Sequence, residues 1–215
     1  MKLQPHTKLL MIGDSITDWS RARPIGEAVL DALGTGYVGV VNAYLTATHP
    51  EHRIRVVNMG VSGNTVRDLA ARWSTDVVAL SPDWLSIMIG INDVWRQFDG
   101  GLLTEQYVTL DEYAQTLDTL ISTVRPGLQG LVLMTPYFIE PNRADPMRAL
   151  MDRYGAVVRQ LAGRHGAVLV DTQAAFDQAM THTHPLAMAP DRIHPNLVGH
   201  LVLARAFVNA LDCGW

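Results

Sequence analysis

Short apolar runs alternate along the chain with longer amphipathic stretches, and this alternation constrains the fold more than any other feature. Five runs have the length and composition of strands buried on both faces: residues 8–12, 55–58, 84–89, 131–135 and 167–170. Helical periodicity lies between or after them, at about residues 37–48, 65–80, 110–124, 146–164 and 196–211. The repeated strand–helix order predicts a doubly wound α/β fold, with a parallel sheet between two layers of helices.

Size and composition fit one globular domain. The chain has 215 residues, of which 48% are hydrophobic, and it can bury a substantial core. Because the sequence contains no repeat, low-complexity tract or linker, we expect a single domain over residues 1–215. The formal net charge of −4 argues against nucleic acids and anionic membranes as partners. The apolar run near the N-terminus is too short for a signal peptide or a membrane span, so we expect a cytoplasmic protein.

Residues suited to chemistry follow the predicted strands. Ser15 follows the first strand, Gly60 the second and Asn92 the third, and the segment 191–195 precedes the last predicted helix. Sites in open parallel sheets form beyond the carboxyl ends of the strands. We therefore expect these segments to meet at one edge of the sheet.

These residue types match the needs of acyl transfer, which are a nucleophile, a base, a group that orients the base, and donors for an oxyanion. Ser15 can supply the hydroxyl and His194 the base. Asp191 lies three residues before His194, so one turn can bring its carboxylate to the imidazole Nδ1. The backbone N–H groups of Ser15 and Gly60 and the side-chain amide of Asn92 can donate to the oxyanion. The sequence thus predicts a serine hydrolase that cleaves esters.

The four segments, in this order, resemble the SGNH hydrolases, also called the GDSL esterase family. That family is named for a serine, a glycine, an asparagine and a histidine in four sequence blocks, and its acid matches Asp191 here. The matching residues are Ser15, Gly60, Asn92 and His194. The resemblance covers about residues 8–207 and implies a flavodoxin-like, three-layer α/β/α sandwich with a five-stranded parallel sheet. It also implies ester hydrolysis through an acyl-serine, without a metal ion or another cofactor.

A narrower resemblance, to bacterial acetylxylan esterases of this family, covers longer stretches. These are residues 13–18, 21–24, 64–69, 90–97 and 171–176. The resemblance implies removal of O-acetyl groups from acetylated xylo-oligosaccharides. It also implies a homo-oligomer, either a dimer or an assembly of dimers. Pro190 departs from the pattern, since some relatives are expected to carry an aromatic residue there.

Trp95 and Arg96 follow Asn92 closely, so we expect them near the site. An aromatic face can pack on a sugar ring and a guanidinium can bind hydroxyls, although core packing or a subunit contact would also explain this pair. Three other functions stay open. The first is hydrolysis of other acyl substrates by an esterase, thioesterase or lysophospholipase. The second is carbohydrate binding on an inactive scaffold, and the third is metal-dependent phosphoester hydrolysis.

Two motifs in loops suggest other chemistry but lack its context. Ser62 does not complete the pattern G-x-S-x-G, so we interpret it as a turn residue or a helix cap rather than a nucleophile. Gly34, Gly36 and Gly39 fit the dinucleotide pattern G-x-G-x-x-G. However, residues 27–33 before them predict a helix, whereas a dinucleotide site requires a buried strand there.

Histidines and acids near the predicted site could suggest a metal centre. His182, His184 and His194 lie close together in sequence, but the spacing of a helical zinc motif is missing. We interpret His182 and His184 as exposed loop residues. Asp14 and Asp93, next to two of the predicted site residues, are interpreted as acceptors that brace the loops.

Overall fold

The computed structural model describes residues 1–27, 30–99 and 103–215, and its centre is a parallel sheet of five strands. The strand order is β2–β1–β3–β4–β5, which is the flavodoxin-like order. All pairings between these strands are parallel. The strands are β1 Lys8–Gly13, β2 Arg55–Asn58, β3 Trp84–Met88, β4 Gly130–Met134 and β5 Val168–Val170. The apolar runs therefore predicted each of the five strands.

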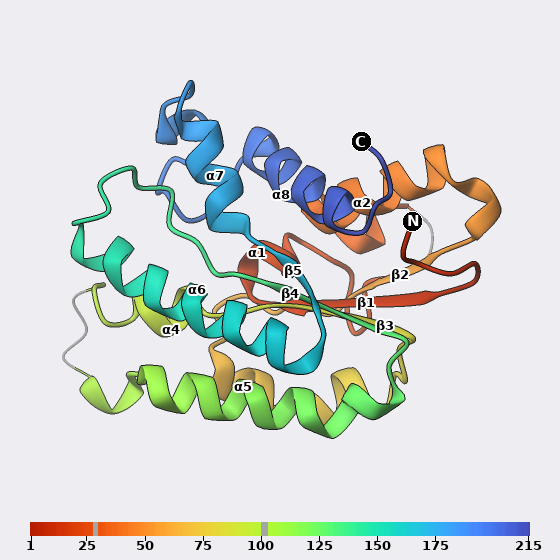
Figure 1. Cartoon of the computed structure of the whole chain (residues 1–215), viewed down its shortest axis with the longest axis horizontal. Coiled ribbons are helices and arrows are strands. Elements are labelled where there is room, and N and C mark those ends of the chain that lie inside the picture. Colours follow the sequence, from red (N-terminus) through yellow and green to blue (C-terminus); the bar gives the residue numbers. More distant parts are fainter. Residues whose placement is uncertain (28–29, 100–102) are drawn as a thin grey trace.

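Helices cover both faces of the sheet and complete the expected three-layer sandwich (Figure 1). On one face α8 packs against α2 and α7, and on the other α5 packs against α3 and α6. The helices are α1 Ser15–Asp18, α2 Tyr37–Thr48, α3 Val66–Ala71, α4 Ile91–Trp95, α5 Leu110–Val124, α6 Pro146–His165, α7 Thr172–Met180 and α8 Leu197–Ala210.

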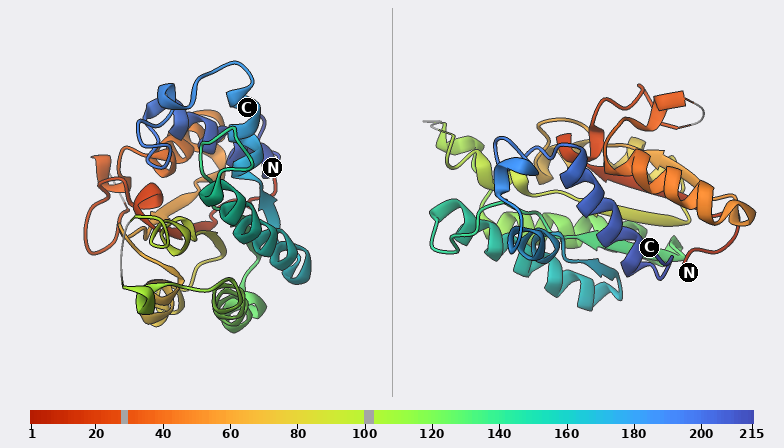
Figure 2. Two further views of the ribbon diagram at one scale, coloured as in Figure 1. Left: turned by 90° about the vertical axis from the view of Figure 1, so that its left-hand side faces the viewer. Right: turned by 90° about the horizontal axis from the view of Figure 1, so that it is seen from above.

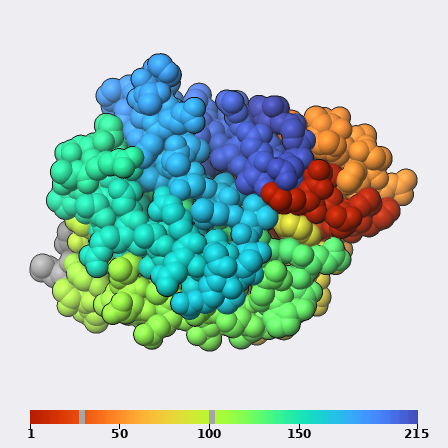
Figure 3. All heavy atoms as spheres, in the orientation of Figure 1, coloured from red at the N-terminus to blue at the C-terminus, as the bar shows by residue number. Residues whose placement is uncertain are grey.

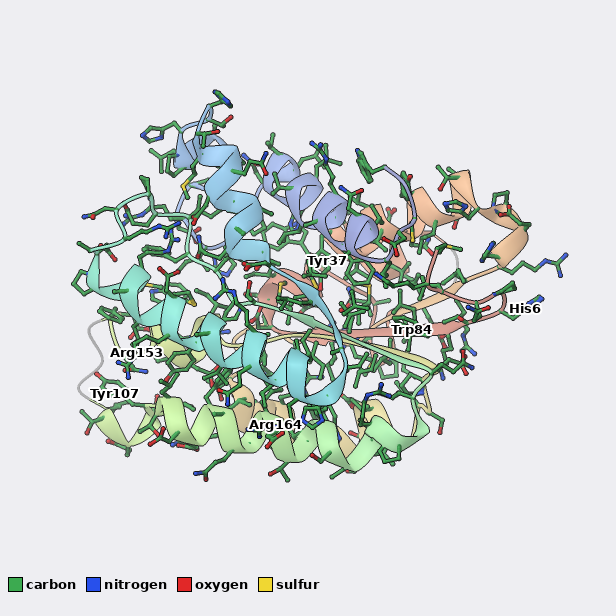
Figure 4. All side chains as sticks on the ribbon, viewed as in Figure 1. His6, Tyr37, Trp84, Tyr107, Arg153 and Arg164 are labelled. Carbon is green, nitrogen blue, oxygen red and sulfur yellow. The ribbon has the colours of Figure 1, made fainter. Side chains whose placement is uncertain are left out.

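The strands are apolar because helices exclude water from both of their faces. Every residue of β3 and β4 is buried. Figure 4 shows Trp84 at one end of the sheet and Tyr37 between the sheet and the helices above it. The Tyr37 side chain is fully buried, and its hydroxyl forms a hydrogen bond of 3.1 Å with Thr17 Oγ1 in α1.

The two ends of the chain lie side by side (Figure 2). The backbone N–H of Lys2 donates to Leu211 O at 2.8 Å, and Lys2 Nζ lies 3.1 Å from Asp212 Oδ2. In the space-filling view the red N-terminal residues pack against the blue C-terminal helix (Figure 3). These contacts lie apart from the site described below, which forms at the carboxyl ends of the strands.

Several helices differ from the expected pattern. The helix predicted at residues 65–80 is interrupted, because α3 ends at Ala71 and a π-helical turn, Ser74–Val78, follows. The helices α1 and α4 have four and five residues, which is too short for their periodicity to be recognised in the sequence. Of the helical stretch expected at residues 27–33, a 3₁₀ turn covers Leu30–Leu33, and residues 28 and 29 lie outside the described part.

Candidate active site

Ser15 is the first residue of α1, directly beyond the carboxyl end of β1. Asp14 caps this short helix, since its Oδ1 accepts the Ile16 N–H at 3.0 Å. The cap turns the chain sharply after the strand and leaves the Ser15 hydroxyl at the start of the helix. Ser15 is half-buried, so its side chain stays accessible at the edge of the sheet.

His194 and Asp191 come from the loop before α8 and meet Ser15 there. Ser15 Oγ lies 3.0 Å from His194 Nε2, and His194 Nδ1 lies 2.7 Å from Asp191 Oδ2. The other carboxylate oxygen, Asp191 Oδ1, accepts the backbone N–H groups of Ile193 at 2.9 Å and His194 at 2.7 Å. One aspartate therefore fixes both the backbone turn and the ring of the histidine. The three residues expected to form a triad lie in one hydrogen-bonded series.

The segment after β4 holds this loop in place. The Tyr137 hydroxyl donates to Ile193 O at 3.0 Å, and the Ile139 N–H donates to Arg192 O at 3.0 Å. The Arg192 guanidinium also pairs with the Glu140 carboxylate. Contacts that hold the backbone of a catalytic loop in this way keep a base within hydrogen-bonding distance of a nucleophile.

The Asp191 carboxylate is held in its charged form. Partial burial by itself would raise the pKa of Asp191, but the hydrogen bonds from the His194 ring and from two backbone N–H groups outweigh it and hold the pKa below its ordinary value. A charged Asp191 accepts a hydrogen bond from the N–H at His194 Nδ1, and this tautomer leaves Nε2 free to accept the proton of Ser15.

Two of the three expected oxyanion donors already donate hydrogen bonds within the protein. Asn92 Nδ2 donates one hydrogen to Asn64 O at 2.9 Å, and its second hydrogen is available. The Gly60 N–H donates to Asn58 Oδ1 at 2.9 Å. The Ser15 N–H belongs to the first turn of α1, where backbone N–H groups have no acceptor within the helix.

Gly60 also has a packing role that its sequence context did not reveal. A Cβ atom built on Gly60 would lie 2.2 Å from Asp18 N and 2.6 Å from Asp18 Cα, so the loop after β2 contacts the backbone of α1 directly. Asn58 reinforces this contact, because its Nδ2 donates to Thr17 O at 2.7 Å. Helix α1, which begins with Ser15, therefore packs directly on the loop that contains Gly60.

We expect Gly60→Ala to lower both activity and stability, because the added methyl group must push α1 and Ser15 out of place. Overpacking of this kind costs about 1–3 kcal/mol of unfolding free energy. Thermal unfolding and the rate of ester hydrolysis would measure the two effects. Gly163→Ala is the matched control, since a Cβ there meets no atom within 4 Å. A Gly60→Ala variant as stable and active as the control would contradict the close contact.

Arg72, which the sequence patterns did not single out, links three of the site segments. Its guanidinium donates to Gly13 O at the end of β1, to Met59 O after β2, and to Asn64 Oδ1, at 2.6–2.9 Å. Asn64 in turn accepts from Asn92 through its backbone oxygen. Arg72 follows α3, so the interruption of the predicted long helix coincides with this cross-link.

Asp14 and Asp93 brace the loops as expected, and both are buried. Asp93 Oδ1 accepts the Val66 N–H at 2.9 Å, which ties the start of α3 to α4, and Asp93 Oδ2 has no hydrogen-bond partner among the described residues. Burial raises the pKa of Asp14 and of Asp93 to about 7 each. Both carboxyl groups therefore take up protons near neutral pH rather than in acid.

The raised pKa of Asp93 predicts a pH-dependent stability. Between the ordinary value of 3.8 and about 7 the folded protein holds a proton that the unfolded chain releases. The stabilising contribution is therefore complete below pH 3.8 and is lost as the pH rises toward 7. Asp93→Asn stays neutral and keeps an oxygen for Val66 N–H. We expect its melting temperature, relative to the wild type, to be higher at pH 8 than at pH 5 by about 3 °C or more. A difference that does not change with pH would contradict this prediction.

A pocket of about 460 Å³ opens beside the histidine. It is lined by Trp19, Pro190, Asp191, His194, Pro195 and Asn196. The Trp19 and Trp95 rings both lie near the imidazole, with centroids 6.3 and 5.9 Å from that of His194. Trp95 therefore lies near the site as expected. The Arg96 guanidinium lies 5.3 Å from the centroid of the Trp95 ring and forms an ion pair of 2.7 Å with Asp99. Trp19 was not recognised from the sequence, although it lies only four residues after Ser15.

The remaining motifs take the structural roles expected of them. Ser62 lies in a turn, and its Oγ donates to Asp18 Oδ2 at 2.9 Å. His182 and His184 are exposed residues between α7 and α8. Within the described ranges, no group of three histidine, cysteine, aspartate or glutamate side chains could hold a metal ion. In the part of the chain that the structure covers, no helix is long and apolar enough to cross a membrane.

A flavodoxin-like sandwich with a hydrogen-bonded serine, histidine and aspartate at the carboxyl edge of its sheet defines the class of SGNH-type serine hydrolases. A model of the GDSL-like lipase/acylhydrolase family matches residues 11–202, and the chain belongs to this family. It is 55% identical to an acetylxylan esterase of Geobacillus stearothermophilus, over 100% of this chain and 98% of that protein.

Solved structures agree with this relationship. The crystal structure of that organism's acetylxylan esterase Axe2 covers 100% of this chain and 97% of its own, with a TM-score of 0.97 and 55% identity. LAE5, an α/β hydrolase from the metagenome of Lake Arreo in Spain, covers 99% of this chain and 98% of its own, with a TM-score of 0.97 and 56% identity. Three Axe2 variants, S15A, D191A and H194A, are described as catalytic mutants, and two others as acetyl-xylooligosaccharide esterases.

Proposed function

We propose that this chain is a serine esterase that removes O-acetyl groups from acetylated xylo-oligosaccharides through an acyl-Ser15 intermediate. The observation that carries the proposal is the series Ser15 Oγ–His194 Nε2–Nδ1–Asp191 Oδ2, with separations of 3.0 and 2.7 Å. In the relative Axe2, replacement of a serine, a histidine or an aspartate with these same numbers gives variants described as catalytic mutants.

In the acylation step Ser15 Oγ attacks the ester carbonyl while His194 Nε2 takes its proton. Asp191 stabilises the imidazolium through Nδ1. The Ser15 N–H and the second hydrogen of Asn92 Nδ2 would donate to the oxyanion, and Gly60 N–H would divide its hydrogen bond between the oxyanion and Asn58 Oδ1. The tetrahedral intermediate then breaks its bond to the sugar oxygen, which takes the proton back from His194.

Deacylation repeats the same steps with water. His194 removes a proton from the water as its oxygen attacks the acetyl carbonyl on Ser15. The new tetrahedral intermediate uses the same donors and collapses to acetic acid, which then releases its proton to solvent, while Ser15 Oγ regains its proton from the imidazolium. In both halves of the reaction His194 therefore first accepts a proton and then donates it. Asp191 supports this by holding the imidazole in a single tautomer.

The leaving alcohol is proposed to be a sugar. The relative Axe2 is described as an acetyl-xylooligosaccharide esterase, and it shares 54–55% of its residues with this chain over the whole length. The open pocket beside His194 is proposed to take the alcohol part of the ester, whose oxygen must come close to this base to receive its proton. Trp95 and Arg96 are proposed as further substrate contacts, since Trp95 lies against the imidazole.

Three features of the whole protein are part of the proposal. One domain over residues 1–215 is supported by the cluster of buried apolar side chains that, among the described residues, runs from Leu3 to Cys213. A homo-oligomer and a cytoplasmic location are the expectations drawn from the sequence. Analytical ultracentrifugation and fractionation of the source cells would test them.

The substrate is tested by acetate release, with a chelator present, from acetylated xylo-oligosaccharides and from acetylated xylan polymer. We expect the oligosaccharides to be hydrolysed faster, and kcat/KM on 4-nitrophenyl esters to fall by about tenfold or more from acetate to butyrate, the order of discrimination that a small pocket achieves. Faster hydrolysis of longer acyl chains would contradict the acetyl assignment. Equal activity on the polymer would contradict the preference for oligosaccharides, and loss of activity with the chelator would contradict metal-independent chemistry.

A further inference from the structure

Trp19 has an unusual backbone conformation directly beside the reacting groups. It ends α1 with φ 34° and ψ 56°, in the left-handed region, and its N–H donates to Ser15 O at 3.1 Å. Glycine is the residue that usually ends a helix in this way, because a side chain is strained there. A bulky residue stays in such a conformation only when its surroundings hold it, and such positions cluster at functional sites.

A glycine-rich segment holds Trp19 in this conformation. A Cβ on Gly34 would lie 2.4 Å from Trp19 O, and a Cβ on Gly36 would lie 2.6 Å from Trp19 Cβ. Thr35 N–H donates to Trp19 O at 3.1 Å between them. These glycines belong to the G-x-G-x-x-G pattern that resembles a dinucleotide motif. In this structure, the close approach to Trp19 accounts for two of its three glycines.

A buried histidine also packs against the indole. The His200 ring packs edge-on against Trp19, with centroids 4.3 Å apart and planes at 73°. His200 Nδ1 accepts the Tyr37 N–H at 3.0 Å, which orients the imidazole. Burial lowers the pKa of His200 to about 4, so the contact is made by a neutral ring. These contacts favour one orientation of the half-buried indole.

The indole forms a wall of the pocket that also contains His194 and Asp191. Pro190, Pro195 and Asn196 line the same pocket. Asn196 Oδ1 accepts the N–H groups of Val198 and Gly199 as the cap of α8, and its Nδ2 donates to Ala187 O at 2.8 Å, so the free surface beside the base is mainly apolar. Trp95 does not line this pocket, although its ring lies at a similar distance from the imidazole. The alcohol part of the ester must lie next to His194 Nε2, because its oxygen takes the proton from there.

We propose that Trp19 is the aromatic platform on which the acetylated sugar packs. This proposal deepens the proposed function and rests on it. The apolar C–H face of a pyranose ring can pack on an indole, whereas its hydroxyls need polar partners at the rim. A platform fixed before binding loses little conformational entropy when the sugar arrives. Trp19 would thus set the specificity for the alcohol part of the ester and leave the acyl chemistry unchanged.

The test compares two acetate esters that differ only in the alcohol. One is an acetylated xylo-oligosaccharide, and the other is ethyl acetate, which has no ring to pack on Trp19. For Trp19→Ala we expect KM for the oligosaccharide to rise and its kcat/KM to fall by about tenfold or more, as for other truncated aromatic platforms. On ethyl acetate kcat/KM should stay within about threefold of the wild type. Trp19→Phe, which keeps an aromatic face, should recover most of the loss.

Three results would overturn the platform. In the first, Trp19→Ala lowers kcat/KM equally on both esters, which would mean that Trp19 only supports α1 and Ser15. In the second, Trp19→Ala changes neither value. In the third, kcat falls on the oligosaccharide while KM is unchanged. A wild type that hydrolyses ethyl acetate but no acetylated xylo-oligosaccharide would instead refute the proposed function, and the sugar platform with it.

Discussion

Ser15→Ala is expected to lower kcat for ester hydrolysis by about 10⁴-fold or more, the order found when a serine nucleophile is removed. The hydroxyl lies 3.0 Å from His194 Nε2, and α1 leaves it half-buried at the edge of the sheet. Alanine removes one oxygen from the first turn of a helix whose cap is supplied by Asp14. The fold should therefore remain intact, and circular dichroism with thermal unfolding would check this.

Ser62→Ala is the matched control for the loss of a hydroxyl. Ser62 belongs to the loop after β2, and its Oγ donates to Asp18 rather than to a base. We expect this variant to keep its rate within about threefold of the wild type, as for a surface hydrogen bond. If Ser62→Ala lost activity and Ser15→Ala kept it, the nucleophile would be wrongly assigned.

Asp191→Asn is expected to lower kcat by about 10⁴-fold, because the amide would fix the wrong tautomer of the histidine. Two backbone N–H groups, of Ile193 and His194, need the oxygen at the Oδ1 position. The amide NH₂ must then face His194 Nδ1. Because an NH₂ group can only donate, Nδ1 must accept this hydrogen bond and cannot carry a proton. The ring proton moves to Nε2, and Ser15 loses the acceptor for its own proton.

Asp145→Asn provides a control with the same local geometry. Asp145 Oδ1 also accepts two backbone N–H groups, of Met147 and Arg148, both at 3.0 Å, but it caps α6 away from the triad. Its activity should match the wild type. An Asp191→Asn variant that kept more than about a tenth of the wild-type rate would show that Asp191 does not set the tautomer. The expected loss should also persist across the pH range, since the amide does not titrate.

The strands and the positions of the candidate catalytic residues could be predicted because both leave a local signal. Each strand is a short apolar run, and Ser15, Gly60 and Asn92 each follow one of the first three strands. Residues at the carboxyl ends of parallel strands lie at the same edge of the sheet. Their proximity can therefore be predicted without knowing how the side chains between them pack. The Asp-x-x-His spacing likewise predicted the contact from Asp191 to His194, since it spans a single turn.

The residues that position the site could not be predicted, since their contacts are distant in sequence. Arg72 reaches the backbone at Gly13 and Met59, and Asn58 accepts the very N–H that was expected to serve the oxyanion. Trp19 owes its position to glycines and a histidine up to 181 residues away in the chain, and its left-handed backbone has no signature in the sequence. The roles of these residues become visible only in the folded structure, where the loops pack against one another.

The central claim is that Ser15 is the nucleophile activated by His194, and covalent labelling tests it most directly. Diethyl 4-nitrophenyl phosphate transfers a stable phosphoryl group to an activated serine and releases nitrophenol. We expect one label per chain, located by mass spectrometry on the peptide that contains Ser15, with activity lost in proportion. His194→Ala should react far more slowly. Inactivation with the label on another residue, or full labelling of Ser15 without loss of activity, would contradict the account.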